Sequence, residues 1–175
     1  MIETARLILR DYRETDRPAF AALNGDPRVG DWVAGTLDRP RSDALMARIR
    51  DHIAREGFGF WAAELKSQRR LVGFVGLQRA APDLPIHPGL ELGWRLIPEV
   101  WGQGLASEGA KAVLDWGFAN LDATELVAIT ARTNLRSQRV MQKIGMTHEP
   151  ARDFDHPRLA PDDPLTPHVT FVARR

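Results

Sequence analysis

An alternating apolar stretch, two closely spaced glycines and a long run of helix-forming residues follow one another between residues 90 and 120. Over residues 90–96, leucine and tryptophan alternate with other residues, which is the period of a β-strand with one buried face. Pro98 ends that strand because proline lacks the N–H that a ladder needs. From Gly104 to about Asn120, apolar residues are spaced among good helix formers. This strand–turn–helix unit predicts a domain that combines sheet and helix, an α/β fold.

The turn of this unit, Gly102-Gln103-Gly104, has the composition of an anion-binding loop. Glycine lets the backbone approach a ligand closely and adopt positive φ, and the first turn of the following helix presents unpaired N–H groups at the positive end of its dipole. Such a cradle suits a pyrophosphate. The turn lacks the Gly-Lys-Ser/Thr of a P-loop and the third glycine of a dinucleotide fingerprint, and Gly-x-Gly also occurs in ordinary turns.

The rest of the chain is predicted to alternate between strands and helices. Before the unit we expect a strand at Arg6–Arg10, a helix capped by Thr15 that runs to about Asn24, a loop-rich segment at Gly25–Pro40, a helix capped by Ser42 that ends at Gly57, a hairpin of Phe58–Leu65 and Leu71–Leu77, and a loop at Pro82–Gly89. After it we expect a strand at Leu126–Thr130, a helix from Asn134 to Ile144 closed by Gly145, and strands at Met146–Phe154 and His168–Ala173. Prolines cluster from 150 to 167, which predicts an ordered or semi-ordered loop.

The composition fits one domain over residues 1–175, since a domain usually holds about 150 residues. The absence of cysteine excludes disulfides, thiolate metal sites and an acyl-cysteine intermediate. With 24 Lys plus Arg against 23 Asp plus Glu, the net charge of +1 argues against a nucleic-acid partner. The charged N-terminus has no signal-peptide core, and no apolar stretch reaches about 18 residues, so we expect a cytoplasmic protein with no membrane partner.

Four ordered motifs resemble the GCN5-related N-acetyltransferases (GNAT) over nearly the whole chain. They are the opening Thr4–Arg10, the strand Leu90-Glu91-Leu92-Gly93-Trp94, the turn Trp101-Gly102-Gln103-Gly104-Leu105-Ala106-Ser107-Glu108, and Asn134-x-x-Ser137 with Gly145-Met146 further on. These residues are similar to the branch that acetylates the N-termini of ribosomal proteins, the RimJ/RimL-like branch. Trp101 stands where the wider family has Gln or Arg, which leaves phosphate contacts at that position to backbone N–H groups.

The resemblance implies the GNAT fold, a single mixed, mostly antiparallel twisted sheet of six to seven strands with about four flanking helices. It implies a V-shaped split between the fourth strand, at 90–96, and the fifth, at 126–130, into which the pantetheine arm of acetyl-CoA inserts. A backbone N–H near a bulge in the fourth strand would polarise the thioester carbonyl. The residues implied in cofactor binding are Arg95, Leu96, Ile97, Trp101, Gly102, Gln103, Gly104, Leu105, Ala106 and Asn134. Asn134 also suits a helix N-cap.

Direct acetyl transfer needs a base for the amine and an acid for the departing thiolate. Many relatives use a tyrosine as the acid, but Tyr12 is the only tyrosine and follows the first strand. Ser137 is therefore the candidate acid, because it lies three residues after Asn134 on the same helical face; a serine within a helix can also bond back to a carbonyl. Glu91 is the predicted base, since burial would raise its pKa. The alternatives for Glu91 are a pair with an arginine or a water chain that replaces it.

The acceptor stays open at this stage. We expect an acetyl-CoA-dependent N-acetyltransferase that acts on a primary amine, either the α-amine of a protein N-terminus or a small amine such as an amino acid, amino sugar or antibiotic. A non-catalytic CoA-binding domain is the alternative outside the enzymes. The histidines are scattered, which predicts no metal site, and the protein is expected to be a monomer or a homodimer. The basic residues expected near the 3′-phosphate of CoA are Arg132, Arg136, Arg139 and Lys143.

Overall fold

A computed structural model shows the fold of the chain and describes residues 1–33 and 35–175. Within these residues, nine strands form one sheet and five α-helices flank it. The strands are β1 (Ile2–Glu3), β2 (Leu7–Arg10), β3 (Phe60–Leu65), β4 (Arg70–Arg79), β5 (Leu90–Leu96), β6 (Glu125–Ala131), β7 (Thr147–His148), β8 (Phe154–Asp155) and β9 (Pro167–Arg174). The helices are α1 (Arg17–Gly25), α2 (Pro27–Gly30), α3 (Arg39–Glu56), α4 (Leu105–Asn120) and α5 (Leu135–Lys143), with 3₁₀ turns η1 (Glu14–Asp16), η2 (Pro98–Val100) and η3 (Pro150–Arg152).

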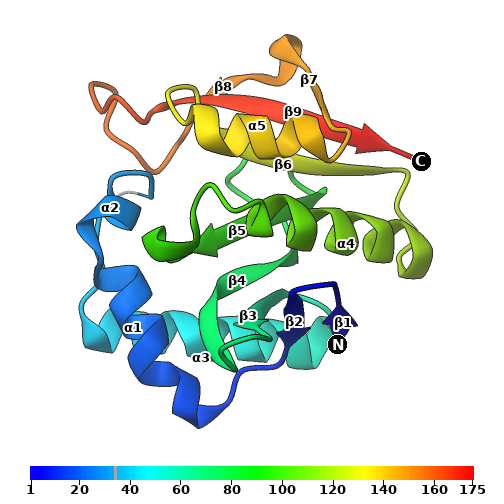
Figure 1. Cartoon of the computed structure of the whole chain (residues 1–175). Coiled ribbons are helices and arrows are strands. Elements are labelled where there is room, and N and C mark those ends of the chain that lie inside the picture. Colours follow the sequence, from blue (N-terminus) through cyan, green and yellow to red (C-terminus); the bar gives the residue numbers. More distant parts are fainter. Residues whose placement is uncertain (34) are drawn as a thin grey trace.

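The sheet is mixed and divides near its middle. The strand order is β1-β2-β3-β4-β5-β6-β9-β7, with β8 also paired to β9. Every pairing is antiparallel except that of β5 with β6, which is parallel and has a single register pair, Glu91 with Val127. Figure 1 shows α5 and β6–β9 on one side of this division and β1–β4 on the other, with α4 running alongside it. The expected mixed, mostly antiparallel α/β fold is confirmed.

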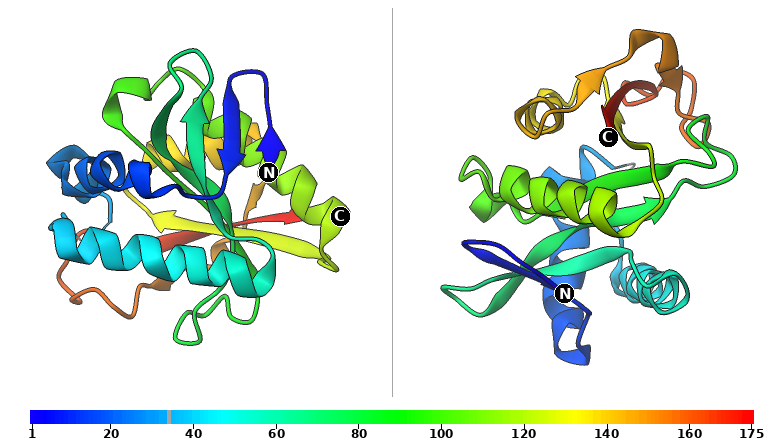
Figure 2. Two further views of the ribbon diagram at one scale, coloured as in Figure 1. Left: turned by 90° about the horizontal axis from the view of Figure 1, so that it is seen from below. Right: turned by 90° about the vertical axis from the view of Figure 1, so that its right-hand side faces the viewer.

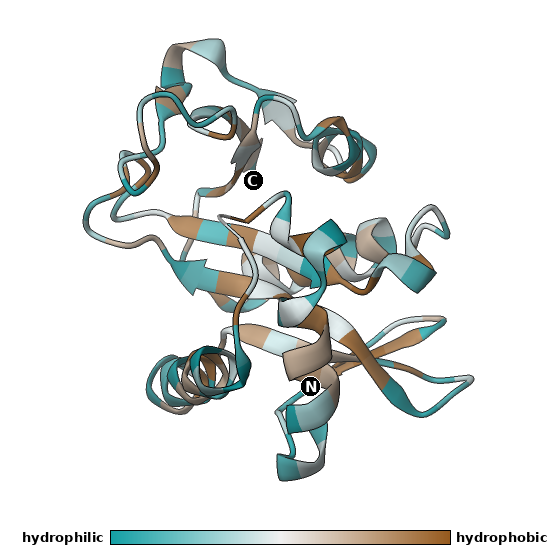
Figure 3. Ribbon diagram, turned by 90° about the vertical axis from the view of Figure 1, so that its left-hand side faces the viewer, coloured by the Kyte–Doolittle hydropathy of each residue, from teal (hydrophilic) through white to brown (hydrophobic). Residues whose placement is uncertain are grey.

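Helices cover both faces of the N-terminal half of the sheet. On one face α4 packs residues such as Val113 against β2–β5, and on the other α1 and α3 pack Phe20 and Met46 against β3 and β4. The alternation of side chains along β4 explains the two cores, because Val75 belongs to the first and Phe74 to the second. Figure 2 shows α3 and α4 on opposite sides of the strands, and Figure 3 shows hydrophobic residues concentrated on the strands and hydrophilic ones on the outer side of the helices.

The extra elements beyond the predicted set are short. Six strands have four residues or more, which agrees with the predicted six to seven, whereas β1, β7 and β8 have two residues each. The fifth helix, α2, lies in the segment Gly25–Pro40 that the sequence predicts as loop-rich. It forms because Asp26 caps it by accepting from Arg28 N at 2.9 Å and Pro27 suits a first helical turn. Ala34 of that segment lies outside the described residues.

Two predicted N-caps are wrong. Thr15 lies within η1, and α1 begins after Asp16, whose carboxylate accepts from Arg13 N at 2.7 Å. The N-cap of α3 is Asp38 rather than Ser42, because the Asp38 side chain accepts from Arg41 N at 2.9 Å. Ser42 lies inside α3, fully buried, where its hydroxyl accepts from the amide of Asn24 at 2.9 Å.

The strand predicted at Met146–Phe154 is also wrong as a continuous element. The segment forms β7, then the 3₁₀ turn η3, then β8, all beside β9. Pro150 opens η3, and a proline cannot donate to a ladder, so pairing stops there. The proline-rich loop that follows is held to the body by Arg158, which donates to both carboxylate oxygens of Asp83 at 2.6 and 2.7 Å.

Candidate active site

The division of the sheet creates an open edge along β5. The register pair of Glu91 with Val127 joins β5 to β6, and beyond it β5 continues to Leu96 without a β6 partner among the described residues. Parallel strands that separate after one pair leave backbone donors and acceptors unmatched, and such groups are costly unless a ligand or water satisfies them. Glu91 therefore stands at the apex of an opening whose wall is hydrogen-bonding backbone.

The N–H groups on this open edge come from alternate residues of β5. Ile97 N donates to Val72 O on β4 at 2.9 Å. Because successive backbone groups of a strand point to opposite sides, the N–H groups of Trp94 and Leu96 point to the open edge. Arg95, Leu96 and Ile97 are all implied in cofactor binding, but only Leu96 has its backbone N–H and carbonyl on the open side, whereas those of Arg95 and Ile97 face β4.

The expected bulge in the strand at 90–96 is wrong for the described chain. β4 and β5 pair along their whole contact without a register shift. The irregularity lies one strand further, where the β3–β4 register shifts after Ala63 and Gly73 has a φ of 145°. A Cβ on Gly73 would lie 2.0 Å from Arg95 O, so glycine is required for β4 to approach β5 this closely.

The glycine turn precedes a helix end with free N–H groups. Gly102 and Gly104 have φ of 75° and 79°, the left-handed region that glycine adopts without strain. α4 begins directly after Gly104 without a side-chain cap, and the first intrahelical bond runs from Glu108 N to Gly104 O at 3.0 Å. The N–H groups of residues 105–107 therefore lack a helical acceptor. Leu105 is buried and anchors the turn, Ala106 packs beside the core, and a Cβ on Gly102 would meet nothing within 4 Å. This is the geometry of an anion site.

Trp101 connects the open edge to the next helix. Its indole Nε1 donates to Leu96 O at 2.7 Å, and the guanidinium carbon of Arg136 lies 5.1 Å from its ring centroid. The indole N–H thus fixes the end of β5. A cavity of about 520 Å³ opens beside it. The cavity is lined by Arg28, Asp31, Trp32, Trp101, Thr133, Leu135, Arg136 and Arg139.

The N-terminal motif holds the glycine turn from outside. Glu108, in the first turn of α4, accepts from Thr4 Oγ1 at 2.6 Å, from Arg6 N at 2.8 Å and from Arg6 Nε at 2.7 Å. Arg6 Nη1 also donates to Gln103 O at 2.9 Å. Burial raises the pKa of Glu108, but these hydrogen bonds outweigh it and lower the pKa below its usual value. The sequence alone assigns Thr4 and Arg6 no role in the site. The signal that could have indicated one is that the motif Thr4–Arg10 occurs together with the motif that contains Glu108.

Asn134 and Ser137 are joined at the start of α5. Asn134 is the N-cap: its Oδ1 accepts from Ser137 N at 3.2 Å, and its Nδ2 donates to Ser137 Oγ at 3.3 Å. The predicted cap is confirmed. In the described part of the chain, the Ser137 hydroxyl does not bond back to a helix carbonyl, so its proton is free for another acceptor.

Glu91 has the environment of a weak acid. Its side chain lies on the face of β5 opposite Leu92, toward β4, where Gln78 Nε2 donates to its Oε2 at 2.9 Å. Burial raises the pKa of Glu91 above its usual value, although the hydrogen bond from Gln78 and the charge of Arg158 each lower it in part. A carboxylate with a raised pKa is a stronger base than an exposed one, which suits proton transfer near neutral pH.

The other candidates from the sequence lie further out. Tyr12 is buried against Phe20, its hydroxyl lacks a described partner, and burial raises its pKa well above its usual range, so the structure gives it no route to a departing thiolate. Arg132, Arg139 and Lys143 are exposed on and before α5, with Arg132 3.7 Å from Asp153. They form a cationic surface along α5, the helix that Asn134 caps.

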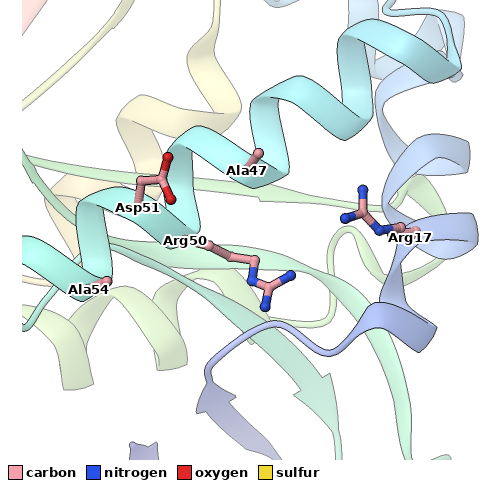
Figure 4. Close-up of a pocket in the computed structure, with 5 residues that line it drawn as sticks. All are labelled: Arg17, Ala47, Arg50, Asp51 and Ala54. Carbon is pink, nitrogen blue, oxygen red and sulfur yellow. The ribbon is translucent and has the colours of Figure 1, made fainter.

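A second, smaller cavity of about 280 Å³ lies on the outer side of α3, against the start of α1. Figure 4 shows its lining of Arg17, Ala47, Arg50, Asp51 and Ala54. Arg17 and Arg50 both bond to Glu14, so its cations are already paired. The cavity is separate from the open edge of β5.

No group of three or more histidine, cysteine or acidic side chains within residues 1–33 and 35–175 is arranged to hold a metal ion. Over the same residues, the helices are too short or too polar to cross a bilayer.

Comparison with known proteins places these features in one family. The family described as an acetyltransferase (GNAT) domain matches residues 6–147. The N-acetyltransferase YoaA of Bacillus subtilis, itself uncharacterised, is 28% identical over 151 residues, which are 85% of this chain and 84% of that protein. The FsC-acetyl coenzyme A-N(2)-transacetylase of Aspergillus fumigatus is 29% identical over 160 residues, 84% of this chain and 65% of that protein.

Solved structures with the same fold include several acetyltransferases. A GNAT-family acetyltransferase from Bacillus anthracis superposes with a TM-score of 0.81 at 22% identity, covering 99% of this chain and 97% of its own. RimL, a ribosomal L7/L12 α-N-protein acetyltransferase in complex with coenzyme A, gives 0.80 at 15% identity, with 98% and 95% covered. Spermidine N-acetyltransferase of Vibrio cholerae, with CoA and spermine, gives 0.75 at 19% identity, with 97% and 96% covered. With a family match over most of its length and a sheet that opens beside a glycine turn, the chain belongs to the GNAT acetyltransferases.

Proposed function

We propose that this protein transfers an acetyl group from acetyl-CoA directly to a primary α-amine. The observation that carries the proposal is that the open edge of β5 leads into the free N–H groups at the start of α4. The edge supplies N–H groups at Trp94 and Leu96, and the helix supplies those of residues 105–107. A thioester carbonyl and a pyrophosphate are both stabilised by N–H donors. The two sets of donors therefore fit these two groups of one acetyl-CoA molecule.

Besides the open edge of β5, the glycine turn and Asn134 would hold acetyl-CoA. Backbone N–H groups from Gly102 to Ser107 would receive the pyrophosphate, and Arg6 and Glu108 keep that turn in place from the other side. Asn134 would bond to the pantetheine arm. When bound, acetyl-CoA supplies the activated acetyl group, and the absence of cysteine leaves no thiol on this chain to carry it in between.

Two side chains would move the protons. The amine nitrogen forms a bond to the acetyl carbon, and Glu91 takes the proton that this amine loses, directly or through a water molecule. As the carbon–sulfur bond breaks, the hydroxyl of Ser137 gives its proton to the departing sulfur and recovers one from solvent. Ser137 has that proton free, since its described hydrogen bond is one it accepts.

An α-amine is the acceptor that needs the least help from the site to lose its proton. Its pKa is near ~8, against ~10.4 for a lysine side chain, so a larger share is neutral at pH 7. The named relatives act on different amines: RimL on a protein N-terminus, and the Vibrio cholerae enzyme on spermidine. Because proteins with this fold act on different amines, the side chains that line the acceptor site of this chain determine which amine it prefers.

Calorimetry with CoA and a thiol-release assay with α-amines test the proposal together. We expect CoA to bind, thiol to appear when an amine is added, and Ser137→Ala to slow thiol release while CoA affinity is retained. Ser67→Ala, in the exposed turn between β3 and β4, is the control and should behave as the wild type. CoA binding with no thiol release from any amine would instead identify a non-catalytic CoA-binding domain, and failure to bind CoA at millimolar concentration would exclude both.

A further inference from the structure

Arg95 is a cation in an unusual place. It lies on β5 between Trp94 and Leu96, and its side chain is on the face of the sheet that carries α1 and α3. Its guanidinium carbon lies 5.3 Å from the ring centroid of Phe74, and its Nη1 donates to Asn24 Oδ1 at 2.7 Å. Arg95 as a whole is half-buried, so part of the residue remains accessible to solvent.

No carboxylate neutralises this cation among the residues that the structure describes. Its Nε is buried and has no described acceptor, and the buried hydroxyl of Tyr12 nearby also lacks one. Burial lowers the pKa of Arg95 to about 10, so it remains charged at neutral pH. Arg10 shows the usual arrangement for comparison: it is buried and bonds to two carboxylates, those of Asp16 and Glu64.

Asn24 holds the guanidinium but does not compensate its charge. The Asn24 amide nitrogen donates to Phe20 O and to Ser42 Oγ, both at 2.9 Å, which fixes the direction of the oxygen that Arg95 uses. A guanidinium has five N–H donors, and this one uses a single donor on a neutral acceptor. A partly buried charge without a counter-ion destabilises the folded protein. The unpaired guanidinium of Arg95 therefore suits an anionic group that a ligand brings into the site.

The position of Arg95 identifies that ligand as the acceptor. The backbone N–H groups on either side of it face the open edge, whereas its side chain points to the other surface of the strand, so it adjoins the reaction centre without lying on the CoA side. Glu91 lies on the same face four residues earlier, about 13 Å along the strand. A base and a cation on the same face of one strand match an amine that also carries a carboxylate, with a water molecule relaying the amine proton across the remaining distance to Glu91.

We propose that Arg95 binds a carboxylate of the acceptor, so that the preferred substrates are α-amines with a carboxylate a few bonds away. This inference rests on the proposed function and adds the substrate class to it. Two sources have this chemistry: a free amino acid, and a peptide whose first residue is acidic. Polyamines are disfavoured, because Arg95 would repel their second cation.

Matched acceptors in a thiol-release assay test the inference. One arm compares a free amino acid with its carboxamide, and the other compares peptides that begin with Asp or with Asn. In at least one arm we expect kcat/KM to be about 10- to 100-fold higher for the carboxylate, the range of one charge-assisted hydrogen bond. Arg95→Gln should remove this preference, and Arg95→Lys should restore part of it. Arg48→Gln, at an exposed position of α3, is the matched control and should leave it unchanged.

The possible failures are distinguishable. Equal rates for acid and amide in both arms would overturn the role of Arg95 while leaving the acetyltransferase activity in place. An Arg95→Gln variant that loses activity equally on every acceptor would show that Arg95 only supports the fold, and would also overturn the role. If that variant does not fold, the wild-type ratios and competition by an N-blocked amino acid still decide. No thiol release with any amine would refute the proposed function and this inference with it.

Discussion

Replacing Glu108 by alanine tests how the N-terminal motif supports the glycine turn. The carboxylate accepts three hydrogen bonds, from Thr4 Oγ1 and from two nitrogens of Arg6. A hydrogen bond to a charged group contributes about 1.5–3 kcal/mol when protected, but the Arg6 side chain is 47% exposed against 18% for Glu108, so water recovers much of that loss. We expect a net loss of about 2.5 kcal/mol, which at about 2–4 °C per kcal/mol lowers Tm by about 5–10 °C.

Thermal unfolding followed by circular dichroism measures this change, and calorimetry measures the accompanying rise in the Kd for CoA. The folded-state pKa of Glu108 is lowered, so its stabilisation is present above its ordinary pKa of about 4.5 and is lost as the pH falls through the lowered value. The difference in Tm between wild type and variant should therefore shrink below about pH 4.5. Glu14→Gln, an exposed carboxylate paired with Arg17, is the control and should change Tm very little. A Glu108→Ala variant that unfolds within about 1 °C of the wild type would refute the reasoning.

Three further outcomes are expected. Glu91→Gln should lower kcat without changing CoA affinity and should abolish the acid limb of the pH–rate profile, whose midpoint lies above the ordinary glutamate pKa; a retained limb would exclude Glu91 as the base. Gly104→Ala and Gly145→Ala both place alanine at positive φ, at a cost of about 1–2 kcal/mol each, but only the first should weaken CoA binding in calorimetry. Arg10→Met should lower the urea midpoint by the equivalent of about 3–5 kcal/mol, because it removes the ion-pair partner of buried Asp16 and leaves buried Glu64 with only the exposed Arg13 at 3.2 Å; a smaller loss would show that water and Arg13 compensate these carboxylates.

Local signals account for the parts of the fold that the sequence predicts well. β5 is found at the predicted bounds because alternation and Pro98 both act within a few residues. Capping shows the limit of such signals. Asp38 and Ser42 are both good N-cap residues, and the choice between them depends on the burial of Ser42 against Asn24, a contact between two helices. No local pattern contains that contact.

In the candidate site, too, local motifs are predictable from the sequence and contacts between distant residues are not. The glycine turn and the Asn134 cap are local motifs, so their residues and spacing predict their geometry. The bonds from Arg6 to Glu108 join residues 102 positions apart, and the uncompensated charge of Arg95 depends on which carboxylates the fold brings near it. Charge pairing in a folded chain is a property of the tertiary structure, so the sequence alone could not separate Arg95 from the paired arginines.

Amide hydrogen exchange with and without CoA tests the location of the site most directly. Resolved by residue, exchange should slow on CoA binding at Trp94 and Leu96 on the open edge of β5 and over residues 102–107 at the start of α4, while Ile97, already bonded to Val72, should change little. Slowing confined to other elements, such as α1 and α3 around the outer cavity, or no slowing at saturating CoA, would contradict the placement of acetyl-CoA between β5 and β6.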